Sequence, residues 1–407
     1  MRRCGWWRLL LGWLACCNAF AQAGPGPLAA QQACDAAFSA VDGQMRADIE
    51  AGAYPGAVYM LSVAGRSVHH AALGMSQLSP PLPLQEDAIF RLASLSKPIT
   101  AVAIMMLVDE GKLTLDDPLP RYLPEFARLR LADGTQPAAA ITLRQLLTHT
   151  SGLLADARDL AAFAEAWRQR STLAAQMPVY AQWPLASAPG TRFAYSAFMG
   201  FDVLARVVEV VSGQSYERFL QTRLFAPLQM RDTGFRLSPA QQARLVPLYR
   251  RSRQGLLPSF SEFNSETYFS GAAGLYSTGA DYLRFAHMLA GHGQLGSVRI
   301  LSRAAADQLN QLQLPANFPG LPEGMAWGLG MRIVSADPYL PPGSYGWSGA
   351  YGGHFWIDPQ HDLVAVLLLN ISNAGGAAAP SAQAFEARSM QVLPFCDPVR
   401  FSPPAKE

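Results

Sequence analysis

The sequence predicts an α+β fold: an antiparallel sheet flanked by N- and C-terminal helices, with a large, mostly helical insertion. Two observations support this prediction. Strand-like segments cluster toward the two ends of the chain, and helical patterns fill the region between them. A helical pattern also lies outside the strands at each end, where it can cover one face of a sheet. We therefore predict a discontinuous sheet domain over 30–112 and 265–398, interrupted by a helical domain over 113–264.

The N-terminal part of the sheet domain is predicted to be a helix, a hairpin and a second helix. Apolar residues recur at helical spacing from Cys34 to Ile49. Two apolar segments, 56–63 and 67–73, flank a short turn that contains a glycine, which is typical of a β-hairpin. An apolar run over 99–108 then predicts the second helix.

The insertion and the C-terminal half show the same kinds of signal. Helical patterns occur at 143–149, 201–211 and 216–220, joined by turns that contain proline or glycine. Strand signals return after Gly271. The elements predicted from there are a strand at 273–278, a helix at 279–289, strands at 325–334, 352–357 and 363–369, and a final helix at 382–392.

The first residues of the chain have the pattern of a secretory signal peptide. A basic start is followed by a short apolar run at 9–15 and by an A-x-A cleavage site that ends at Ala21. We therefore predict a signal peptide over 1–21, cleaved near Ala21, and an exported protein that is periplasmic or secreted. The alternative is a lipoprotein signal that uses Cys16 or Cys17, which would attach the protein to a membrane.

The charge and the histidine spacing narrow the classes of partner. The formal net charge is +2, and removal of the three arginines in the predicted signal peptide changes it to about −1. A neutral body lacks the basic footprint of a nucleic-acid-binding protein, so we expect no nucleic-acid partner. The histidines His149, His287, His292, His354 and His361 lack the spacing of metal ligands, so we expect no metal site.

Two cysteines remain after the predicted cleavage. They are Cys34 and Cys396, near opposite ends of the chain. Because an oxidising compartment favours disulfides, we predict that they form a bridge. The alternative is a pair of unpaired thiols that only pack.

A serine and a lysine lie three residues apart, directly before the apolar run of the second predicted helix. The chain has three lysines, Lys97, Lys112 and Lys406, and arginine supplies its other basic residues. Arginine stays protonated in proteins, whereas a desolvated lysine can lose its proton. Lys97 is therefore suited to deprotonate the hydroxyl of Ser94. The alternative is a chance S-x-x-K pattern with a solvated lysine.

Two further segments could complete a site around Ser94. Tyr195 lies in a turn before a predicted helix, where it could transfer a proton to a leaving group or only pack. The segment 346–353 is rich in glycine, which allows its backbone to approach a substrate. A backbone N–H from this segment, together with that of Ser94, could form an oxyanion hole.

These segments together resemble the serine β-lactamase and penicillin-binding-protein family, and within it the class C type. The resemblance depends on Ser94–Lys97, Tyr195–Ala197 and Trp347–Gly349 in the family's order, and it covers nearly the whole mature chain. Supporting segments are Leu146–Leu153, Gly274–Thr278, Asp281 and Trp356–Pro359.

The resemblance implies the β-lactamase/transpeptidase-like fold and a serine hydrolase mechanism without a metal or an organic cofactor. Ser94 would be the acylated nucleophile, and Lys97 its base or proton relay. Tyr195 would be the second base and the acid for the leaving group. The backbone N–H groups of Ser94 and Ala350 would hold the oxyanion.

Two departures from the family pattern bear on the substrate. Ala197 stands where the family usually has an asparagine, and Trp347 stands where it usually has a lysine or histidine that binds a carboxylate. Loss of a charge-assisted contact costs about 1.5–3 kcal/mol, which weakens acidic substrates about 10- to 100-fold. The tryptophan resembles the pattern of family VIII carboxylesterases. We predict an uncharged ester as substrate, contacted by Ala197, Trp347, Ser348 and Gly349.

Other functions stay open at this point. A β-lactamase, a D-alanyl-D-alanine carboxypeptidase or a D-amino-acid peptidase that acts on amides would use the same three residues. A sensor or scaffold with the penicillin-binding fold, which acylates slowly or not at all, is the alternative that is not an enzyme. An α/β-hydrolase with Ser348 as nucleophile is disfavoured, because the alternation of strands and helices that this fold requires is absent from the sequence.

Overall fold

A computed structural model of the chain describes residues 27–169, 171–260, 266–372, 374–376 and 379–396. The predicted signal peptide over 1–21 lies outside these residues. In the described part of the chain, none of the helices combines the length and the apolar character that a membrane crossing requires.

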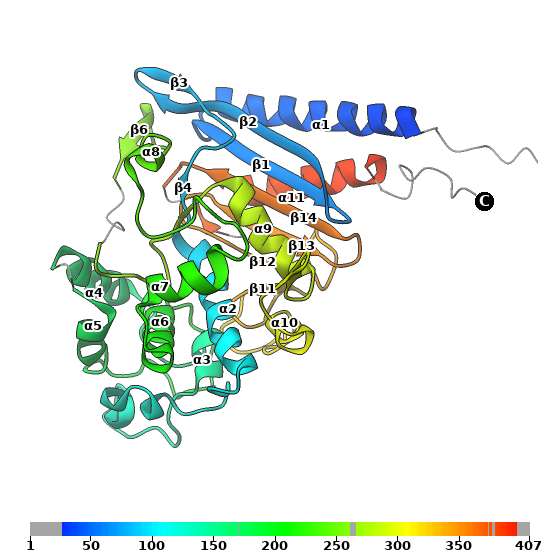
Figure 1. Cartoon of the computed structure of the whole chain (residues 1–407). Helices are drawn as coiled ribbons and strands as arrows, with labels where there is room; N and C mark the ends of the chain where they lie inside the picture. Colours follow the sequence, from blue (N-terminus) through cyan, green and yellow to red (C-terminus); the bar gives the residue numbers. More distant parts are fainter. Residues whose placement is uncertain (1–26, 170, 261–265, 373, 377–378, 397–407) are drawn as a thin grey trace, which may run out of the picture.

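An eight-stranded antiparallel sheet forms the centre of the fold (Figure 1). Its strands are β1 (Gly56–Val63), β2 (Arg66–Leu78), β3 (Pro81–Pro83), β10 (Met325–Trp327), β11 (Arg332–Val334), β12 (Tyr345–Ser348), β13 (His354–Asp358) and β14 (Leu363–Leu369). The order across the sheet is β10-β11-β12-β13-β14-β1-β2-β3. Because β1 pairs with β14, the N-terminal and C-terminal strands form one sheet, as the α+β prediction requires.

Helices cover both faces of this sheet. The N-terminal helix α1 (Pro27–Glu50) and the C-terminal helix α11 (Pro380–Val392) lie on one face, and α2 (Ser96–Asp109) and α9 (Gly279–Ala290) lie on the other (Figure 1). Alternate residues of β1 serve the two cores, with Tyr59 packed toward the terminal helices and Val58 toward α2 and α9. Burial on both faces explains why β1 is mostly apolar rather than alternating, with Ser62 as a buried polar residue within it.

The region between the two halves of the sheet is mostly helical, as predicted. Its helices are α3 (Leu143–Leu147), α4 (Ala157–Arg168), α5 (Leu173–Tyr180), α6 (Met199–Ser212), α7 (Tyr216–Leu220) and α8 (Pro239–Gln242), with the shorter turns η2 (Leu119–Arg121), η3 (Pro124–Arg128) and η4 (Gln221–Phe225). Small elements elsewhere are β4 (Phe90–Arg91), β7 (Tyr276–Ser277), β8 (Gln294–Leu295), β9 (Val298–Arg299), α10 (Arg303–Leu309) and η6 (Leu393–Phe395). The core of this region is continuous with the core under α2 and α9.

Two details differ from the sequence-based expectation. The strand predicted at 325–334 is a hairpin, in which β10 pairs with β11. The chain reverses at Gly330, whose φ of +76° is a conformation that favours glycine. The region predicted to be helical also ends in a second hairpin, made of β5 (Leu248–Ser252) and β6 (Gly255–Ser259).

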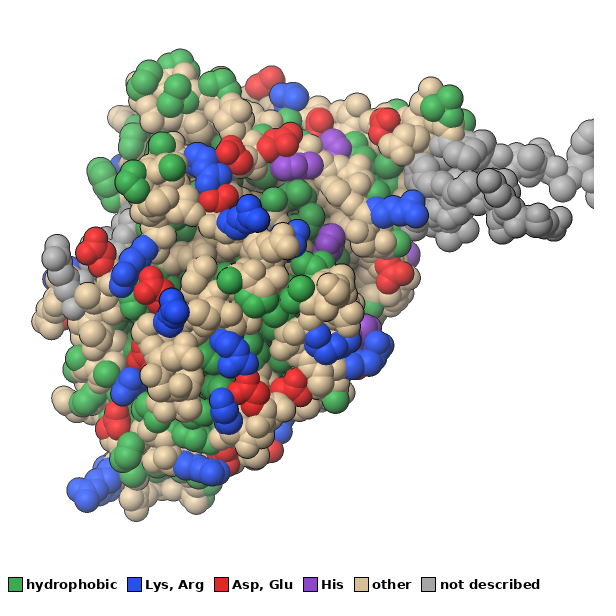
Figure 2. All heavy atoms as spheres, in the orientation of Figure 1, with side chains coloured by type: hydrophobic (Ala, Val, Ile, Leu, Met, Phe, Trp, Pro, Cys, Tyr) green, Lys and Arg blue, Asp and Glu red, His purple; other side chains and the backbone are tan. Residues whose placement is uncertain are grey.

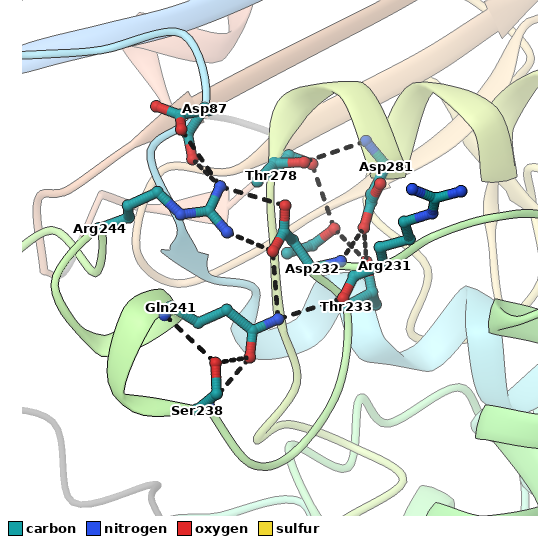
Figure 3. A network of polar contacts seen from close by, with 10 residues as sticks. Asp87, Arg231, Asp232, Thr233, Ser238, Gln241, Arg244, Thr278 and Asp281 are labelled. Carbon is teal, nitrogen blue, oxygen red and sulfur yellow. Dashed lines mark hydrogen bonds and ion pairs between the residues drawn. The ribbon is translucent and has the colours of Figure 1, made fainter.

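A polar network connects the helical region to the sheet region (Figure 3). Arg244 forms ion pairs with Asp87, at 3.3 Å between Nη1 and Oδ2, and with Asp232. On the other side, Asp281 of α9 accepts hydrogen bonds from the backbone N–H of Asp232 at 2.7 Å and from the Thr233 hydroxyl at 3.0 Å. The two regions therefore contact each other through specific polar groups as well as through the shared core.

The surface carries charges of both signs. Figure 2 shows lysine and arginine side chains interspersed with aspartate and glutamate over the face in view. Exposed ion pairs such as Arg158 with Asp156 add little stability, because water screens both partners.

The structure joins Cys34 and Cys396 in a disulfide between α1 and the end of the chain's described part, with 5.0 Å between their Cα atoms. Both cysteines are 1% exposed. We expect peptide mapping of the protein under non-reducing conditions to recover the Cys34 peptide linked to the Cys396 peptide. Alkylation of both thiols in the denatured, unreduced protein would contradict this prediction.

Candidate active site

Ser94 lies in a tight turn that precedes α2. The sequence suggests that Ser94 opens the helix, whereas the structure places it in a short 3₁₀ turn, η1 (Ala93–Leu95), with α2 beginning at Ser96. Ala93 has a φ of +46°, which is an unfavourable conformation for a residue other than glycine. Such backbone strain is common at functional sites. The turn is held by the hydroxyl of Tyr282, which donates to the carbonyl of Leu95 at 2.9 Å.

Lys97 lies beside Ser94, as the spacing predicts. Its Nζ is 3.0 Å from the Ser94 Oγ, and it also donates to the carbonyls of Ala197 at 2.7 Å and Ala272 at 3.1 Å. The lysine side chain is fully buried. Carbonyl oxygens can only accept, so they take two N–H groups of the amine. In the neutral amine, the remaining lone pair is therefore directed at the hydroxyl of Ser94.

A buried carboxylate, Asp159 of α4, holds the segment that carries Tyr195 and Ala197. It accepts hydrogen bonds from the Ser196 hydroxyl at 3.1 Å and from the backbone N–H groups of Phe198 and Met199 at 3.0 and 2.9 Å. The last two N–H groups lie at the N-terminus of α6, where a carboxylate is favourable. Burial raises the pKa of Asp159, although these hydrogen bonds and the charge of Lys97 oppose that rise.

A second buried carboxylate, Asp202 of α6, holds the other segment that contacts Lys97. Its Oδ1 accepts from the Ser270 hydroxyl at 2.5 Å and from the backbone N–H of Ala272 at 3.2 Å. Its Oδ2 accepts from the Tyr268 hydroxyl at 2.7 Å. Each carbonyl that contacts Lys97 thus belongs to a segment fixed by its own buried carboxylate.

The pKa of Asp202 leads to a prediction about how the stability of the fold depends on pH. Burial raises its pKa from an ordinary value of 3.8 to about 6. The folded protein therefore keeps this proton to a higher pH than the unfolded chain does, and the free energy of unfolding falls as the pH rises from 4 to 6. A shift of this size corresponds to about 3 kcal/mol. We expect Asp202→Asn to remove this part of the decline, as measured by urea unfolding from pH 4 to 7.

Exposed Asp133 provides the control for that measurement. Its pKa is lowered by hydrogen bonds from Thr135, so it titrates below the pH range of the experiment. The variant Asp133→Asn is therefore expected to keep the wild-type decline. An equal decline in Asp202→Asn and in the wild type would show that Asp202 is ionised over the whole range.

Tyr195 approaches the lysine from the other side. The Lys97 Nζ lies 5.0 Å from the centroid of the Tyr195 ring. The indole Nε1–H of Trp347 donates to the Tyr195 hydroxyl oxygen at 3.2 Å, so the tyrosine O–H is left free to donate elsewhere. Trp347 is thus a hydrogen-bond donor to Tyr195 as well as a predicted contact of the substrate.

His149 packs against Tyr195. The sequence-based interpretation did not assign this role to His149. Its ring lies 4.5 Å from the Tyr195 ring, between centroids, and its Nδ1 accepts from the backbone N–H of Ser196 at 3.2 Å. Burial and the charge of Lys97 hold the pKa of His149 well below its usual value. The histidine is therefore a neutral packing partner of the tyrosine segment.

The glycine-rich turn between β12 and β13 packs directly on the Ser94 turn. A side chain at Gly349 would place its Cβ 2.3 Å from the Leu92 carbonyl oxygen, and one at Gly353 would lie 2.7 Å from the Leu95 side chain. Only glycine allows this approach at position 349, because the nearest atom there belongs to the backbone. The turn carries Ala350, so the two segments predicted to supply the oxyanion N–H groups, those of Ser94 and Ala350, are in contact.

Ala197 and Ser348 are two of the residues predicted to bind substrate, and the polar groups of both are engaged within the protein. The side chain of Ala197 contributes no polar group, and its backbone carbonyl is occupied by Lys97. Ser348 is 3% exposed, and its hydroxyl lies 2.7 Å from the Nδ1 of His354 rather than beside Tyr195. A direct substrate contact of these two residues stays a prediction.

A cavity of about 550 Å³ lies at another place in the fold. It is lined by the end of α9 and the turns at the ends of β1, β13 and β14, and it includes neither Ser94, Lys97 nor Tyr195. The volume of this cavity does not by itself indicate a catalytic function. We base the site on Ser94, Lys97 and Tyr195, which the structure brings together.

The sequence profile of the Beta-lactamase family matches residues 41–388, which is most of the chain. The chain belongs to the Beta-lactamase family. It is accordingly a serine hydrolase with the β-lactamase/transpeptidase-like fold.

Relatives with known names agree with this membership. The chain is 32% identical to Esterase EstB from Burkholderia gladioli over 361 residues, which cover 79% of this chain and 87% of EstB. It is 30% identical to Penicillin-binding protein 4 from Amycolatopsis lactamdurans, with 86% and 89% of the two chains covered. Among solved structures, it is similar to EstCE1, described as a hydrolase with promiscuous acyltransferase activity. That similarity has a TM-score of 0.75 at 26% identity and covers 89% of this chain and 99% of EstCE1.

Proposed function

We propose that this member of the Beta-lactamase family is an exported carboxylesterase, which hydrolyses uncharged esters through an acyl-enzyme on Ser94. The observation that carries this proposal is the contact of the Lys97 Nζ with the Ser94 Oγ at 3.0 Å, in a site where two carbonyls take both N–H groups of the neutral amine. The names of EstB and EstCE1 also support a hydrolase of esters.

In the first step, neutral Lys97 takes the proton of the Ser94 hydroxyl as the Oγ attacks the ester carbonyl carbon. The carbonyl oxygen becomes negatively charged and would accept hydrogen bonds from the N–H groups of Ser94 and Ala350. The contact between the two turns, at Gly349 and Leu92, supports this pairing of donors.

In the second step, the tetrahedral intermediate collapses and the bond to the alcohol oxygen breaks. Tyr195 would give its phenolic proton to that oxygen, so that a neutral alcohol leaves. The hydrogen bond from the Trp347 indole to the Tyr195 oxygen supports this role, because it stabilises the developing tyrosinate. Water then attacks the acyl carbon, and the Tyr195 phenolate takes a proton from it. The bond between that carbon and the Ser94 Oγ breaks, the carboxylic acid leaves, and the Lys97 ammonium returns its proton to the Ser94 Oγ.

The surroundings of Tyr195 favour an apolar, uncharged substrate. Trp347 and Tyr195 pack against a cluster of apolar side chains, made up of Phe193, Leu314, Phe318, Leu321, Met325 and Trp327. A carboxylate placed against this surface would lose its hydration without gaining a cation from Trp347. An ester with an apolar alcohol or acyl group would bury hydrocarbon there instead.

Export of the protein is supported by the bond between Cys34 and Cys396, because such disulfides persist in oxidising compartments. Periplasmic or secreted localisation is therefore part of the proposal.

The substrate claim can be tested directly. We expect the purified protein to cleave short-chain p-nitrophenyl esters much faster than a chromogenic cephalosporin. In Trp347→Lys, the ratio of kcat/KM for the ester to kcat/KM for the cephalosporin should fall about 10- to 100-fold, because the ammonium can pair with the cephalosporin carboxylate. Efficient cephalosporin turnover with poor ester turnover in the wild type would instead favour a β-lactamase or a D-amino-acid peptidase.

A further inference from the structure

A chain of three buried polar side chains lies behind the candidate active site. The Ser348 hydroxyl on β12 is 2.7 Å from the Nδ1 of His354 on β13, and the Nε2 of His354 is 3.0 Å from the Oε1 of Glu386 on α11. Ser348 and His354 are each 3% exposed, and Glu386 is fully buried. The chain therefore connects the strand that carries Trp347 to the C-terminal helix.

The hydrogen bonds of this chain have a defined direction. A carboxylate can only accept, so the Nε2 of His354 carries a hydrogen and donates to Glu386. In the neutral imidazole, Nδ1 is then unprotonated and accepts the hydroxyl hydrogen of Ser348. The Nη1 of Arg332 lies 3.6 Å from the same Glu386 oxygen, and Arg332 is paired in turn with Asp337 at 2.5 Å.

This serine, histidine and glutamate have the composition of a catalytic triad, but a substrate cannot reach the serine. Successive residues of a strand point to opposite faces, and Trp347 points toward Tyr195. Ser348 consequently points toward α11, away from the nucleophile Ser94. Because Ser348 is buried, it cannot attack a substrate. The hydrogen bonds that join Ser348, His354 and Glu386 therefore need another explanation.

Stability alone is a poor explanation. The Glu386 Oε2, the Arg332 Nε and the Trp356 Nε1 are buried without a hydrogen-bond partner among the residues that the structure describes. Such unpaired polar atoms destabilise a fold, and apolar side chains of similar volume at these places would be at least as stable. A buried polar chain that is costly to stability is more reasonably explained by the geometry it imposes.

Ser348 and His354 lie at the base of the turn 349–353, so the geometry that they impose is that of this turn. Ser348 and His354 lie directly opposite each other and are the last pair of β12 and β13 before the turn 349–353. The turn is closed by the Gly349 N–H, which donates to the Gly353 carbonyl at 2.7 Å. Ala350 lies inside it. The separation and twist of Ser348 and His354 therefore contribute to the direction of the Ala350 N–H. They act together with the hydrogen bonds from the Gly352 N–H to the Gly349 carbonyl at 3.0 Å and from the Ala374 N–H to the Ala350 carbonyl at 3.1 Å.

We propose that Ser348, His354 and Glu386 are positioning residues for the oxyanion hole: their hydrogen-bonded chain holds the 349–353 turn so that the Ala350 N–H is aimed at the oxyanion formed on Ser94 acylation. This inference rests on the proposed function, because it assumes that Ala350 is an oxyanion donor. Ser348 then acts through His354 and the turn, and not by the substrate contact that its place in the sequence suggests.

The experiment compares three serine variants with p-nitrophenyl butyrate as substrate. Ser348→Ala removes the hydroxyl, Ser348→Thr keeps it, and Ser344→Ala is the matched control. Ser344 precedes β12, is fully buried, and its hydroxyl has no hydrogen-bond partner among the described residues. We expect kcat to fall about 10- to 100-fold in Ser348→Ala, with KM within about twofold of the wild type, because a small misplacement of a donor weakens only transition-state binding.

The other variants extend the test along the chain. Ser348→Thr is expected to restore most of kcat, and Ser344→Ala to keep the wild-type value. His354→Gln should lower kcat as much as Ser348→Ala does, and the double variant should be no worse than His354→Gln alone, because the two residues act as one unit. If His354→Gln fails to fold, the comparison of Ser348→Ala with Ser348→Thr still decides the question.

Two outcomes would overturn the inference. One is wild-type kcat in Ser348→Ala, and the other is an equal loss of kcat in Ser348→Ala and Ser348→Thr together with a lowered Tm, which indicates packing alone. Labelling of Ser94 by a neutral p-nitrophenyl phosphonate, read by peptide mass, separates this result from failure of the proposed function. Without labelling of Ser94 in the wild type, the proposed function itself is wrong.

Discussion

Ester hydrolysis should fall about 10⁴-fold or more in kcat when Ser94 is replaced by alanine, because the substitution removes the proposed nucleophile. The reasoning is geometric. Ser94 is the hydroxyl that Lys97 contacts, and the nearest alternative on the same segment, Ser96, is fully buried at the start of α2. The measurement is kcat and KM for p-nitrophenyl butyrate in the purified variant.

Ser96 also provides the matched control. Its hydroxyl has no hydrogen-bond partner among the described residues, so Ser96→Ala should keep kcat within about twofold of the wild type. Comparable activity in Ser94→Ala and the wild type would show that the nucleophile lies elsewhere. A loss in both serine variants, with an equal drop in Tm, would indicate disruption of the turn rather than of the chemistry.

Local patterns in the sequence predicted the parts of this site that depend on short-range geometry. A spacing of three residues is enough to place an amine beside a hydroxyl on one helical turn, and the scarcity of lysine made Lys97 distinctive. The strands on both sides of the insertion were also predictable, because β14 is a continuous apolar run and β1 is apolar apart from Ser62. The pairing of Cys34 with Cys396 was predicted from the expected oxidising compartment and from the two cysteines that follow the predicted signal peptide, and the structure contains this disulfide.

The groups that hold the site depend on tertiary contacts and have no local signature. Asp159 and Asp202 look like ordinary helix acids in the sequence, yet each is buried and fixes a segment whose carbonyl contacts Lys97. His149 belongs to a segment that supported the family resemblance, and only the fold shows that its ring packs on Tyr195. The same limit applies to Glu386, whose partner His354 lies on a strand far away in the sequence.

The hairpins missed in the sequence have a related cause. The apolar run at 325–334 has the composition of a single strand, and the reversal depends on the positive φ that Gly330 adopts. In that conformation the Gly330 N–H donates to the Leu147 carbonyl of the helical region. A contact between two distant segments thus decides the local structure, which a local pattern cannot predict.

Replacing Lys97 with arginine should be nearly as damaging as removing the nucleophile, with kcat lowered about 10³-fold or more. The substitution keeps hydrogen-bond donors for the carbonyls of Ala197 and Ala272. What it removes is the lone pair of a neutral amine, which we infer is directed at Ser94 when the two carbonyls take the N–H groups. A guanidinium has no such lone pair and cannot accept the serine proton.

Lys112→Arg is the matched control, because Lys112 lies outside the candidate active site. It lies in the turn after α2 and pairs with Glu110 at 2.8 Å, so Lys112→Arg should leave kcat within about twofold of the wild type. The rate of Ser94 labelling by the neutral phosphonate then separates two explanations for an inactive Lys97→Arg. Slow labelling of a folded variant places the defect in proton removal from Ser94. Labelling at the wild-type rate would mean that Lys97 acts after acylation, and the first step proposed for it would be wrong.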